Sequence, residues 1–157
     1  MRVLAVDTHA DEQQAAELGV IITDAKTLLR ESDVISNHMN LTAENWHFFD
    51  DAGFAAMEKH PIFLNVSRGG SVDEAALVRA LDNGLIRAAG LDVLEAEKPD
   101  LEQCALIGRE NVILTPHAAF YSARSIEALQ RMSCHNLTDC LTGNRAHAFK
   151  IVNGVSI

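Results

Sequence analysis

Short apolar runs alternate with segments of helical periodicity in the first part of the chain. The runs are rich in valine and isoleucine and have the length of buried strands; they lie at residues 3–6, 20–22 and 34–36. Between them, residues 11–18 show the pattern of a helix that Gly19 ends. Either Thr23 or Asp24 is placed to cap a second helix. This pattern predicts two β-α units and the start of a third strand.

The same alternation continues with clearer boundaries. Residues 54–59 show helical spacing, and three more strands are predicted at residues 62–64, 86–91 and 112–114. Asp73 is placed to cap a helix that Gly84 ends in a left-handed conformation. Its four apolar residues on one face are Ala76, Leu77, Ala80 and Leu81. A last helix is predicted from Ser122 to Gly143, followed by a tail, residues 144–157, that is irregular or a short strand.

Strands separated by helices predict the doubly wound α/β class, with a mainly parallel sheet and helices on both faces. Ligands of such sheets bind outside the carboxyl ends of the strands. Five residues with polar side chains fall at or just after those predicted ends: Asp7, His38, Arg68, Asp92 and His117. We therefore expect these residues to share one crevice.

Composition narrows the class of protein. The 157 residues, 48% hydrophobic and 22% charged, suit one globular domain with a core. A formal net charge of -9 argues against nucleic acid and anionic membrane surfaces as partners. The three cysteines lack C-x-x-C spacing and no long apolar segment precedes the first strand, so we expect a reducing, cytoplasmic setting. The histidines and cysteines show no metal-ligand spacing, and no metal is expected.

Arg68 and His117 carry most of the candidate chemistry. Arg68 precedes two glycines, Gly69 and Gly70. Its planar guanidinium suits two-point binding of a carboxylate, and the glycines would let a ligand approach the backbone closely. Pro116 restricts the backbone before His117, whose imidazole suits proton transfer at the end of a strand. The plainer alternatives are a surface arginine and a buried structural histidine.

Three acidic residues are further candidates. Glu97 lies in an acidic run just before Lys98 and Pro99, and Glu95 is a second candidate in the same run. Asp7 follows the first strand, where an acid can accept a hydrogen bond from a ribose 2′-hydroxyl and repel a 2′-phosphate, which would favour NAD over NADP. The alternative is an ordinary turn aspartate.

The order of these residues resembles the D-isomer-specific 2-hydroxyacid dehydrogenases over nearly the whole chain. The motif that carries the resemblance is Arg68 before two glycines, then Asp92, then Glu97 before Pro99, then Thr115-Pro116-His117. Residues 117–122 are similar to the branch that includes the C-terminal-binding-protein corepressors and their phosphoglycerate-dehydrogenase-like relatives. At Asn40 this chain departs from the family's usual His-x-Pro-Leu-Thr.

The resemblance implies a Rossmann-like NAD-binding domain that is incomplete. Residues 1–120 would be part of that domain, and residues 121–157 a helix and tail that return to the substrate domain. The family's opening strand and G-x-G-x-x-G turn do not occur before Asp7. Because that strand lies at the centre of the sheet, we expect unpaired inner edges at Val3 and Val34, weak NAD binding and no catalysis by the isolated chain.

The resemblance also implies the role of each residue. Arg68 would hold the substrate carboxylate and polarise its carbonyl, His117 would exchange a proton with the hydroxyl, and Glu97 would support His117. The implied NAD-contacting residues are Asp7, Met39, Val66, Ser67, Arg68, Asp92, His117 and Ala119. The expected activity is NAD-dependent interconversion of a D-2-hydroxy acid and a 2-keto acid by a homodimer. The alternatives are an NAD(H)-sensing binding module and a gene fragment without activity of its own.

Overall fold

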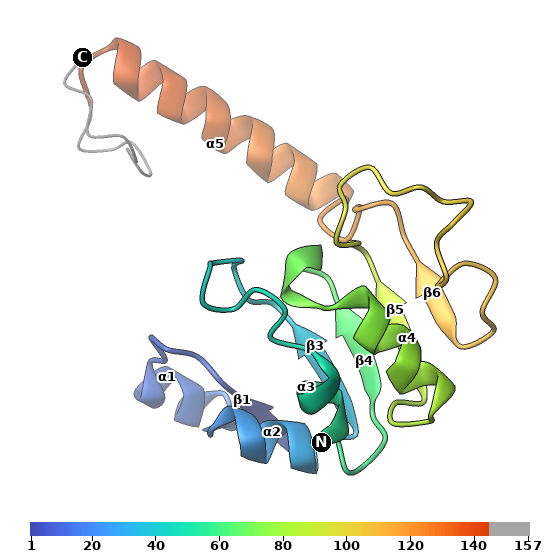
Figure 1. Cartoon of the computed structure of the whole chain (residues 1–157). Helices are drawn as coiled ribbons and strands as arrows, with labels where there is room; N and C mark the ends of the chain where they lie inside the picture. The colour runs from blue at the N-terminus through green and yellow to red at the C-terminus, as the bar shows by residue number, and fades with distance from the viewer. Residues whose placement is uncertain (145–157) are drawn as a thin grey trace. The chain divides into compact units, whose positions relative to one another are not determined.

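The computed structural model of the chain describes residues 1–144 and contains two compact units, with the boundary in the sequence between His117 and Ala118. The first unit holds all the strands in the described part of the chain (Figure 1). The described part of the second unit is dominated by one long helix, α5 (Ala123–Leu141). None of the helices in residues 1–144 combines the length and the apolar composition of a transmembrane segment.

A two-stranded parallel sheet opens the chain. Its strands are β1 (Val3–Ala5) and β2 (Val20–Ile22), with helix α1 (Glu12–Glu17) between them. The carboxylate of Asp11 accepts the N–H of Gln14 at 2.9 Å and caps α1. These elements confirm the first predicted β-α unit, although α1 contains no buried residue.

A second parallel sheet contains four strands in the order β3-β4-β5-β6. They are β3 (Val34–Asn37), β4 (Ile62–Asn65), β5 (Ala88–Leu91) and β6 (Val112–Leu114). β5 begins two residues later than predicted, because the N–H of Ile86 bonds to Ala80 and not to a neighbouring strand. The remaining boundaries confirm the predicted strands to within one residue.

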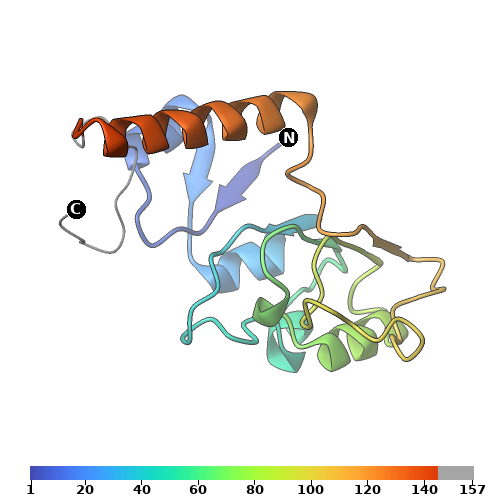
Figure 2. The same cartoon turned by 90° about the horizontal axis from the view of Figure 1, so that it is seen from above.

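Three helices contribute to the core against one face of the four-stranded sheet (Figure 2). They are α2 (Ala25–Glu31), α3 (Asp51–Ala55) and α4 (Glu74–Asp82). Asp24, and not Thr23, caps α2. The largest buried apolar side chains of this core are Phe54, Phe63, Met57, Leu77, Ile86 and Leu106. Parallel strands joined through helices confirm the predicted α/β class.

The position of α3 differs from the predicted helix at residues 54–59. The carboxylate of Asp50 accepts the N–H of Gly53 at 2.9 Å, so the helix begins at Asp51. After Ala55 the chain turns, and the N–H of Met57 bonds back to Phe54. Met57, beyond the end of α3, is therefore buried in a turn and does not belong to a helix.

The two sheets do not share a strand pairing. Within residues 1–144, β1 pairs only with β2, and β3 pairs only with β4. The expectation of unpaired inner edges at Val3 and Val34 is confirmed by this topology. Val34 is about half exposed, as expected for a residue on an open edge of a sheet.

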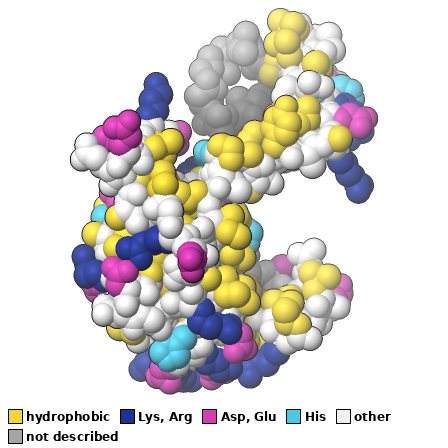
Figure 3. Space-filling model, turned by 90° about the vertical axis from the view of Figure 1, so that its right-hand side faces the viewer, with side chains coloured by type: hydrophobic (Ala, Val, Ile, Leu, Met, Phe, Trp, Pro, Cys, Tyr) yellow, Lys and Arg dark blue, Asp and Glu magenta, His cyan; other side chains and the backbone are white. Residues whose placement is uncertain are grey.

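Helix α5 in the second unit follows the predicted boundaries. Oγ of Ser122 accepts the N–H of Ser125, and Oγ of Ser125 accepts the N–H of Ser122, so the two residues form a capping box. Gly143, just after the helix, has a φ of 75°. α5 contains no buried residue. Its exposed apolar side chains include Leu129, Met132, Leu137 and Leu141 (Figure 3). The predicted tail at residues 145–157 lies outside the described residues.

Candidate active site

A buried polar network joins the carboxyl ends of β3 and β4. Asn37 and Asn65, the last residues of these strands, are opposite each other in the parallel register and are 3% and 1% exposed. Nδ2 of Asn37 donates to Oδ1 of Asn65 at 3.1 Å and to Oγ of Ser71 at 2.7 Å. Such buried amides stabilise a structure only when they are hydrogen-bonded, so this network holds the two strand ends in one arrangement.

The same network holds the backbone of Arg68. The carbonyl of Arg68 accepts hydrogen bonds from Nδ2 of Asn65 at 3.1 Å and from Oγ of Ser71 at 2.7 Å. The guanidinium is exposed, and its Nη1 donates to the carbonyl of Ser67 at 2.8 Å. The backbone of Arg68 is thus anchored from inside while its side chain faces solvent.

Arg68 is followed by a single 3₁₀ turn, η1 (Gly69–Ser71), which packs closely against two other loops. A Cβ on Gly69 would lie 1.9 Å from the carbonyl oxygen of Leu94, and one on Gly70 would lie 2.4 Å from the ring of Trp46. The space at both glycines is occupied by the protein's own groups. The close approach that excludes a side chain at these two glycines is therefore internal, and the approach of a ligand to this turn stays a prediction.

The loops after β3 and β4 are also bonded to each other. Oγ of Ser67 donates to the carbonyl of Met39. The N–H of Met39 bonds to Oδ1 of Asn37 at 3.0 Å, and the N–H of Ser67 bonds to Oδ1 of Asn65 at 3.2 Å. Met39 and Ser67, both among the NAD-contacting residues that the resemblance implies, therefore lie side by side; Val66 is partly exposed next to Ser67.

Backbone hydrogen bonds extend this edge to β5 and β6. The N–H of Asp92, which is 4% exposed, bonds to the carbonyl of Asn65 at 2.9 Å, and its carboxylate accepts a hydrogen bond from Oγ1 of Thr115. The N–H of His117 bonds to the carbonyl of Asp92 at 2.9 Å. His117 has a φ of 52° and is exposed. The segments that carry Arg68, Asp92 and His117 therefore follow one continuous hydrogen-bonded edge.

The side chains of Arg68, Glu97 and His117 are exposed in the segments that follow three neighbouring strands. Within residues 1–144, no ion pair joins any two of them. Their convergence on one substrate stays a prediction. The rival acid Glu95 behaves differently, because its Oε1 lies 3.2 Å from Nε2 of His47.

Asp7 and His38 each make a local side-chain contact. Oδ1 of Asp7 accepts the N–H of His9 at 2.7 Å, which is a turn contact of the kind that the plainer interpretation expects. Nε2 of His38 lies 2.9 Å from Oγ of Ser36. Ala119 belongs to the second compact unit. Trp46 is half exposed, and its ring covers Gly70.

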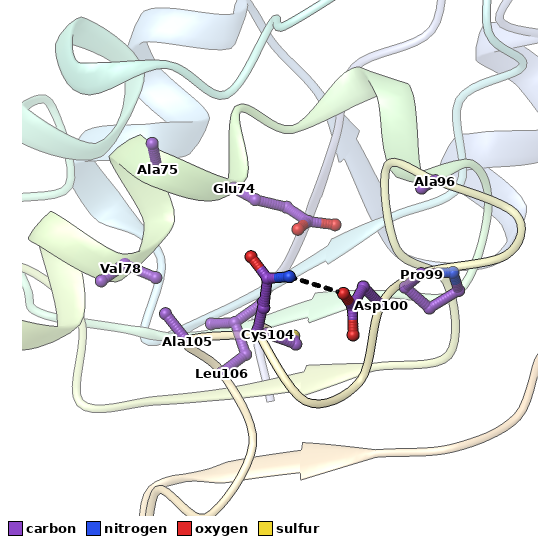
Figure 4. Close-up of a pocket in the computed structure, with 10 residues that line it drawn as sticks. Glu74, Ala75, Val78, Ala96, Pro99, Asp100, Cys104, Ala105 and Leu106 are labelled. Atoms are coloured by element: carbon purple, nitrogen blue, oxygen red, sulfur yellow. Dashed lines mark hydrogen bonds between the residues drawn. The ribbon is translucent and has the colours of Figure 1, made fainter.

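A shallow cavity of about 310 Å³ lies on the other side of the β5 loop, against α4 (Figure 4). Its lining includes Glu74, Val78, Pro99, Cys104 and Leu106. None of the three candidate catalytic side chains lines this cavity. It is therefore distinct from the predicted crevice at the strand ends.

The hydrogen bonds among Asn37, Asn65 and Ser71 were not predicted from the sequence, although the pattern of the two strands contains a signal for them. Asn37 and Asn65 occupy inward positions of strands whose other inward residues, such as Ile35 and Phe63, are apolar. A polar amide at such a position must find a buried partner. Its partner Ser71, 34 residues from Asn37, could not be identified from local spacing.

A parallel, doubly wound α/β sheet with polar residues at its carboxyl edge defines the class of nucleotide-binding α/β domains. The sequence profile described as "D-isomer specific 2-hydroxyacid dehydrogenase, NAD binding domain" matches residues 1–119. The chain belongs to this family.

Individual relatives agree with the profile. The chain is 40% identical over 137 residues to the glyoxylate reductase of Korarchaeum cryptofilum, a match that covers 87% of this chain and 41% of the relative. It is 36% identical over 155 residues to the D-lactate dehydrogenase of Escherichia coli, with 91% and 47% covered. The chain thus spans less than half the length of these two relatives.

The fold matches solved structures in the same way. The D-lactate dehydrogenase of Aquifex aeolicus, complexed with NAD and lactic acid, superposes with a TM-score of 0.87 at 31% identity, covering 99% of this chain and 51% of that one. For the D-lactate dehydrogenase of Lactobacillus jensenii with NAD+, the TM-score is 0.85 at 33% identity, with 97% and 48% covered.

Proposed function

We propose that this chain forms the NAD-binding part of an oxidoreductase that interconverts a D-2-hydroxy acid and the corresponding 2-keto acid. The observation that carries the proposal is the hydrogen-bonded edge from Asn65 through Asp92 to His117. It holds a guanidinium-bearing turn, a buried carboxylate and an imidazole at the carboxyl ends of adjacent strands, where ligands of this sheet class bind.

Arg68 binds the substrate carboxylate in this proposal. Its side chain is exposed, with Nη1 bonded to the carbonyl of Ser67, and its own carbonyl is held by Asn65 and Ser71, so the starting direction of the side chain is set. A guanidinium can donate two parallel N–H groups to one carboxylate, which orients the carbonyl next to it.

His117 transfers the proton. In keto-acid reduction the imidazolium donates a proton to the carbonyl oxygen of the substrate as that oxygen becomes a hydroxyl, and in the reverse direction the neutral imidazole accepts it. Glu97 orients the ring and stabilises its positive charge. When bound, NADH supplies the hydride that the substrate carbon accepts.

Several residues fit the two ends of the dinucleotide. The buried carboxylate of Asp92 and the joined loops of Met39 and Ser67 provide a polar edge for the nicotinamide and its ribose. Asp7, exposed at the end of β1, is placed for the adenosine ribose. The printed sequence contains no G-x-G-x-x-G turn, so we assign the pyrophosphate to no residue of this chain.

Assembly and location are further parts of the proposal. Family resemblance supports a homodimer. Cys104, Cys134 and Cys140 are free thiols, which supports a reducing, cytoplasmic setting. The negative net charge supports a small-molecule substrate and not a nucleic acid.

The test is a chimera in which this chain replaces the matching segment of the Escherichia coli D-lactate dehydrogenase. NADH oxidation is followed with pyruvate and with glyoxylate, and the parent enzyme is the positive control. We expect turnover by the chimera, and we expect His117→Gln to lower kcat by about 10²–10⁴-fold. The chain alone should show weak NADH binding in calorimetry and no turnover.

Two outcomes would contradict the proposal. NADH binding by the chimera without keto-acid-dependent oxidation would favour an NAD(H)-sensing module. Micromolar NADH affinity and turnover by the 157-residue chain alone would refute the expected dependence on a glycine-rich turn.

A further inference from the structure

His47 occupies an unusual position in the loop after β3. Its φ is 52°, in the left-handed region, and its N–H bonds to the carbonyl of Gly70 at 2.9 Å. Its ring stacks on Trp46, with 4.8 Å between ring centroids, while Trp46 covers Gly70. A non-glycine residue in this conformation costs free energy, so the surrounding contacts hold it there.

The imidazole of His47 faces one carboxylate. Nε2 lies 3.2 Å from Oε1 of Glu95 and is buried without a hydrogen-bond partner, so the contact rests on proximity. The two side chains are about one-third exposed. The His47–Glu95 pair joins the loop after β3 to the loop after β5.

Glu95 is held from its other side as well. Its N–H donates to the carboxylate of Glu74, the first residue of α4, and the preceding carbonyl, that of Leu94, lies against Gly69. His47 contacts Gly70 and Leu94 contacts Gly69, so the two loops meet over the turn that follows Arg68.

We propose that the His47–Glu95 pair is a clasp that positions the turn after Arg68, and that Glu95 is a positioning residue. The assignment separates the two acids of the run at residues 95–97. Glu95 is engaged with His47 and α4, whereas none of the ion pairs within residues 1–144 involves Glu97, two residues farther along. Glu97 is therefore the acid left to act with His117; this part rests on the proposed function.

The clasp acts on Arg68 through the backbone. Asn65 and Ser71 hold the carbonyl of Arg68 from inside the protein. The clasp holds the following two glycines from outside. If the clasp opens, the internal bonds remain and the fold persists, but the turn and the guanidinium gain freedom. Loss of precise positioning reduces catalysis without removing a reacting group.

The first experiment needs no activity. Amide resonances of Gly69 and Gly70 are recorded by NMR in the 157-residue chain and in Glu95→Gln, His47→Gln and the double variant. Glu97→Gln, the same change two residues away, is the matched control. We expect Glu95→Gln and His47→Gln to shift both glycine amides, the double variant to shift them no further, and Glu97→Gln to leave them in place.

The second experiment uses the chimera described above. Glu95→Gln should lower kcat/KM roughly tenfold, mainly by raising KM for the keto acid, and should leave the pH profile of kcat unchanged. Glu97→Gln should instead lower kcat and change its pH profile.

The two readouts separate the clasp from the proposed function. Unchanged glycine amides in Glu95→Gln, or additive shifts in the double variant, would overturn the clasp whatever the activity. A chimera without turnover, combined with the expected amide shifts, would leave the clasp in place and contradict the proposed function. A changed pH profile in Glu95→Gln would make Glu95 the acting acid and overturn the assignment.

Discussion

The two sheets of the first unit share a β-α-β pattern but differ in how much they bury. In the β1–β2 sheet each strand has three residues, and α1 contains no buried residue. In the four-stranded sheet, alternate residues of β3, β4 and β5 are buried beneath α2, α3 and α4. Local periodicity alone does not distinguish these regions; the apolar area that each removes from water does.

The edges of the sheets account for the difference. In the described part of the chain β1 pairs only with β2, which leaves this sheet with two open edges, and a two-stranded sheet by itself is marginal in water. β4 and β5 are each paired on both sides. We therefore expect the β1–β2 region to open at a lower free energy than the four-stranded region.

The largest expected effect comes from the four-stranded core. Phe63 is fully buried, with its ring centroid 4.8 Å from that of Phe49. Phe63→Ala should lower the free energy of unfolding by about 3–5 kcal/mol, because a cavity remains. The half-buried Leu4 of β1 is the matched site, and Leu4→Ala should cost about 1 kcal/mol. Urea titrations that give equal losses would contradict the comparison.

The next effect concerns the buried amides at the strand ends. Asn37→Leu removes the donor to Asn65 and Ser71 and leaves the N–H of Met39 without its bond. We expect a loss of about 1–3 kcal/mol in the free energy of unfolding. The control is Ser36→Ala on the exposed face of the same strand, which should change stability by less than about 0.5 kcal/mol. Comparable losses in the two variants would argue against a special role for the network.

A smaller effect compares two equivalent helix caps. Asp73 accepts the N–H of Ala76 at 3.0 Å in α4, and Asp11 accepts that of Gln14 at 2.9 Å in α1. Asp73→Ala should lower the global free energy of unfolding by about 1 kcal/mol. Asp11→Ala should mainly speed amide hydrogen exchange in α1, since that helix can unfold locally. Exchange that accelerates across the whole chain in Asp11→Ala would show that the regions unfold together.

The smallest effect is a pH dependence at the surface of the core region. The hydrogen bond from Arg79 lowers the pKa of Asp51 below its ordinary value of 3.8. A carboxyl group whose pKa is lower in the folded state contributes stability above its unfolded pKa, and this stability is lost as the pH falls through the folded pKa. Arg79→Ala should therefore make stability less sensitive to acid below about pH 4. Thermal melts at neutral and acidic pH measure the change. Identical acid sensitivity of the unmodified chain and Arg79→Ala would argue against a contribution of the Arg79–Asp51 pair to stability.

Local patterns predicted most helices and strands because their determinants are close in sequence. Asp73 and Gly84 bound α4 as expected, and Gly84 has a φ of 68°. The displaced α3 shows the limit of periodicity. Its apolar residues at Phe54 and Met57 are both buried, but one lies on a helix and the other on a turn, and Asp50 decides where the helix begins.

The sequence likewise predicted part of the candidate site. Because parallel strands end at one edge of a sheet, the sequence was sufficient to expect Arg68, Asp92 and His117 near one another, and the backbone bonds of Asp92 link these segments. The sequence left Glu95 and Glu97 as alternatives, since two acids two residues apart have the same local pattern. The contacts that differ are tertiary ones, made by Glu95 with His47, 48 positions before it, and with Glu74 of α4.

The sequence by itself determined the α/β class, the capped helices and the strand-end positions of the candidate residues. These depend on backbone propensity, capping and hydrophobic periodicity, which act over a few residues. The tertiary structure decided the bonds of Asn37 with Asn65 and Ser71, the internal close approach at Gly69 and the pairing of His47 with Glu95. Each joins residues more than twenty positions apart, so its formation depends on how the core places the loops, and local propensity carries no information about that placement.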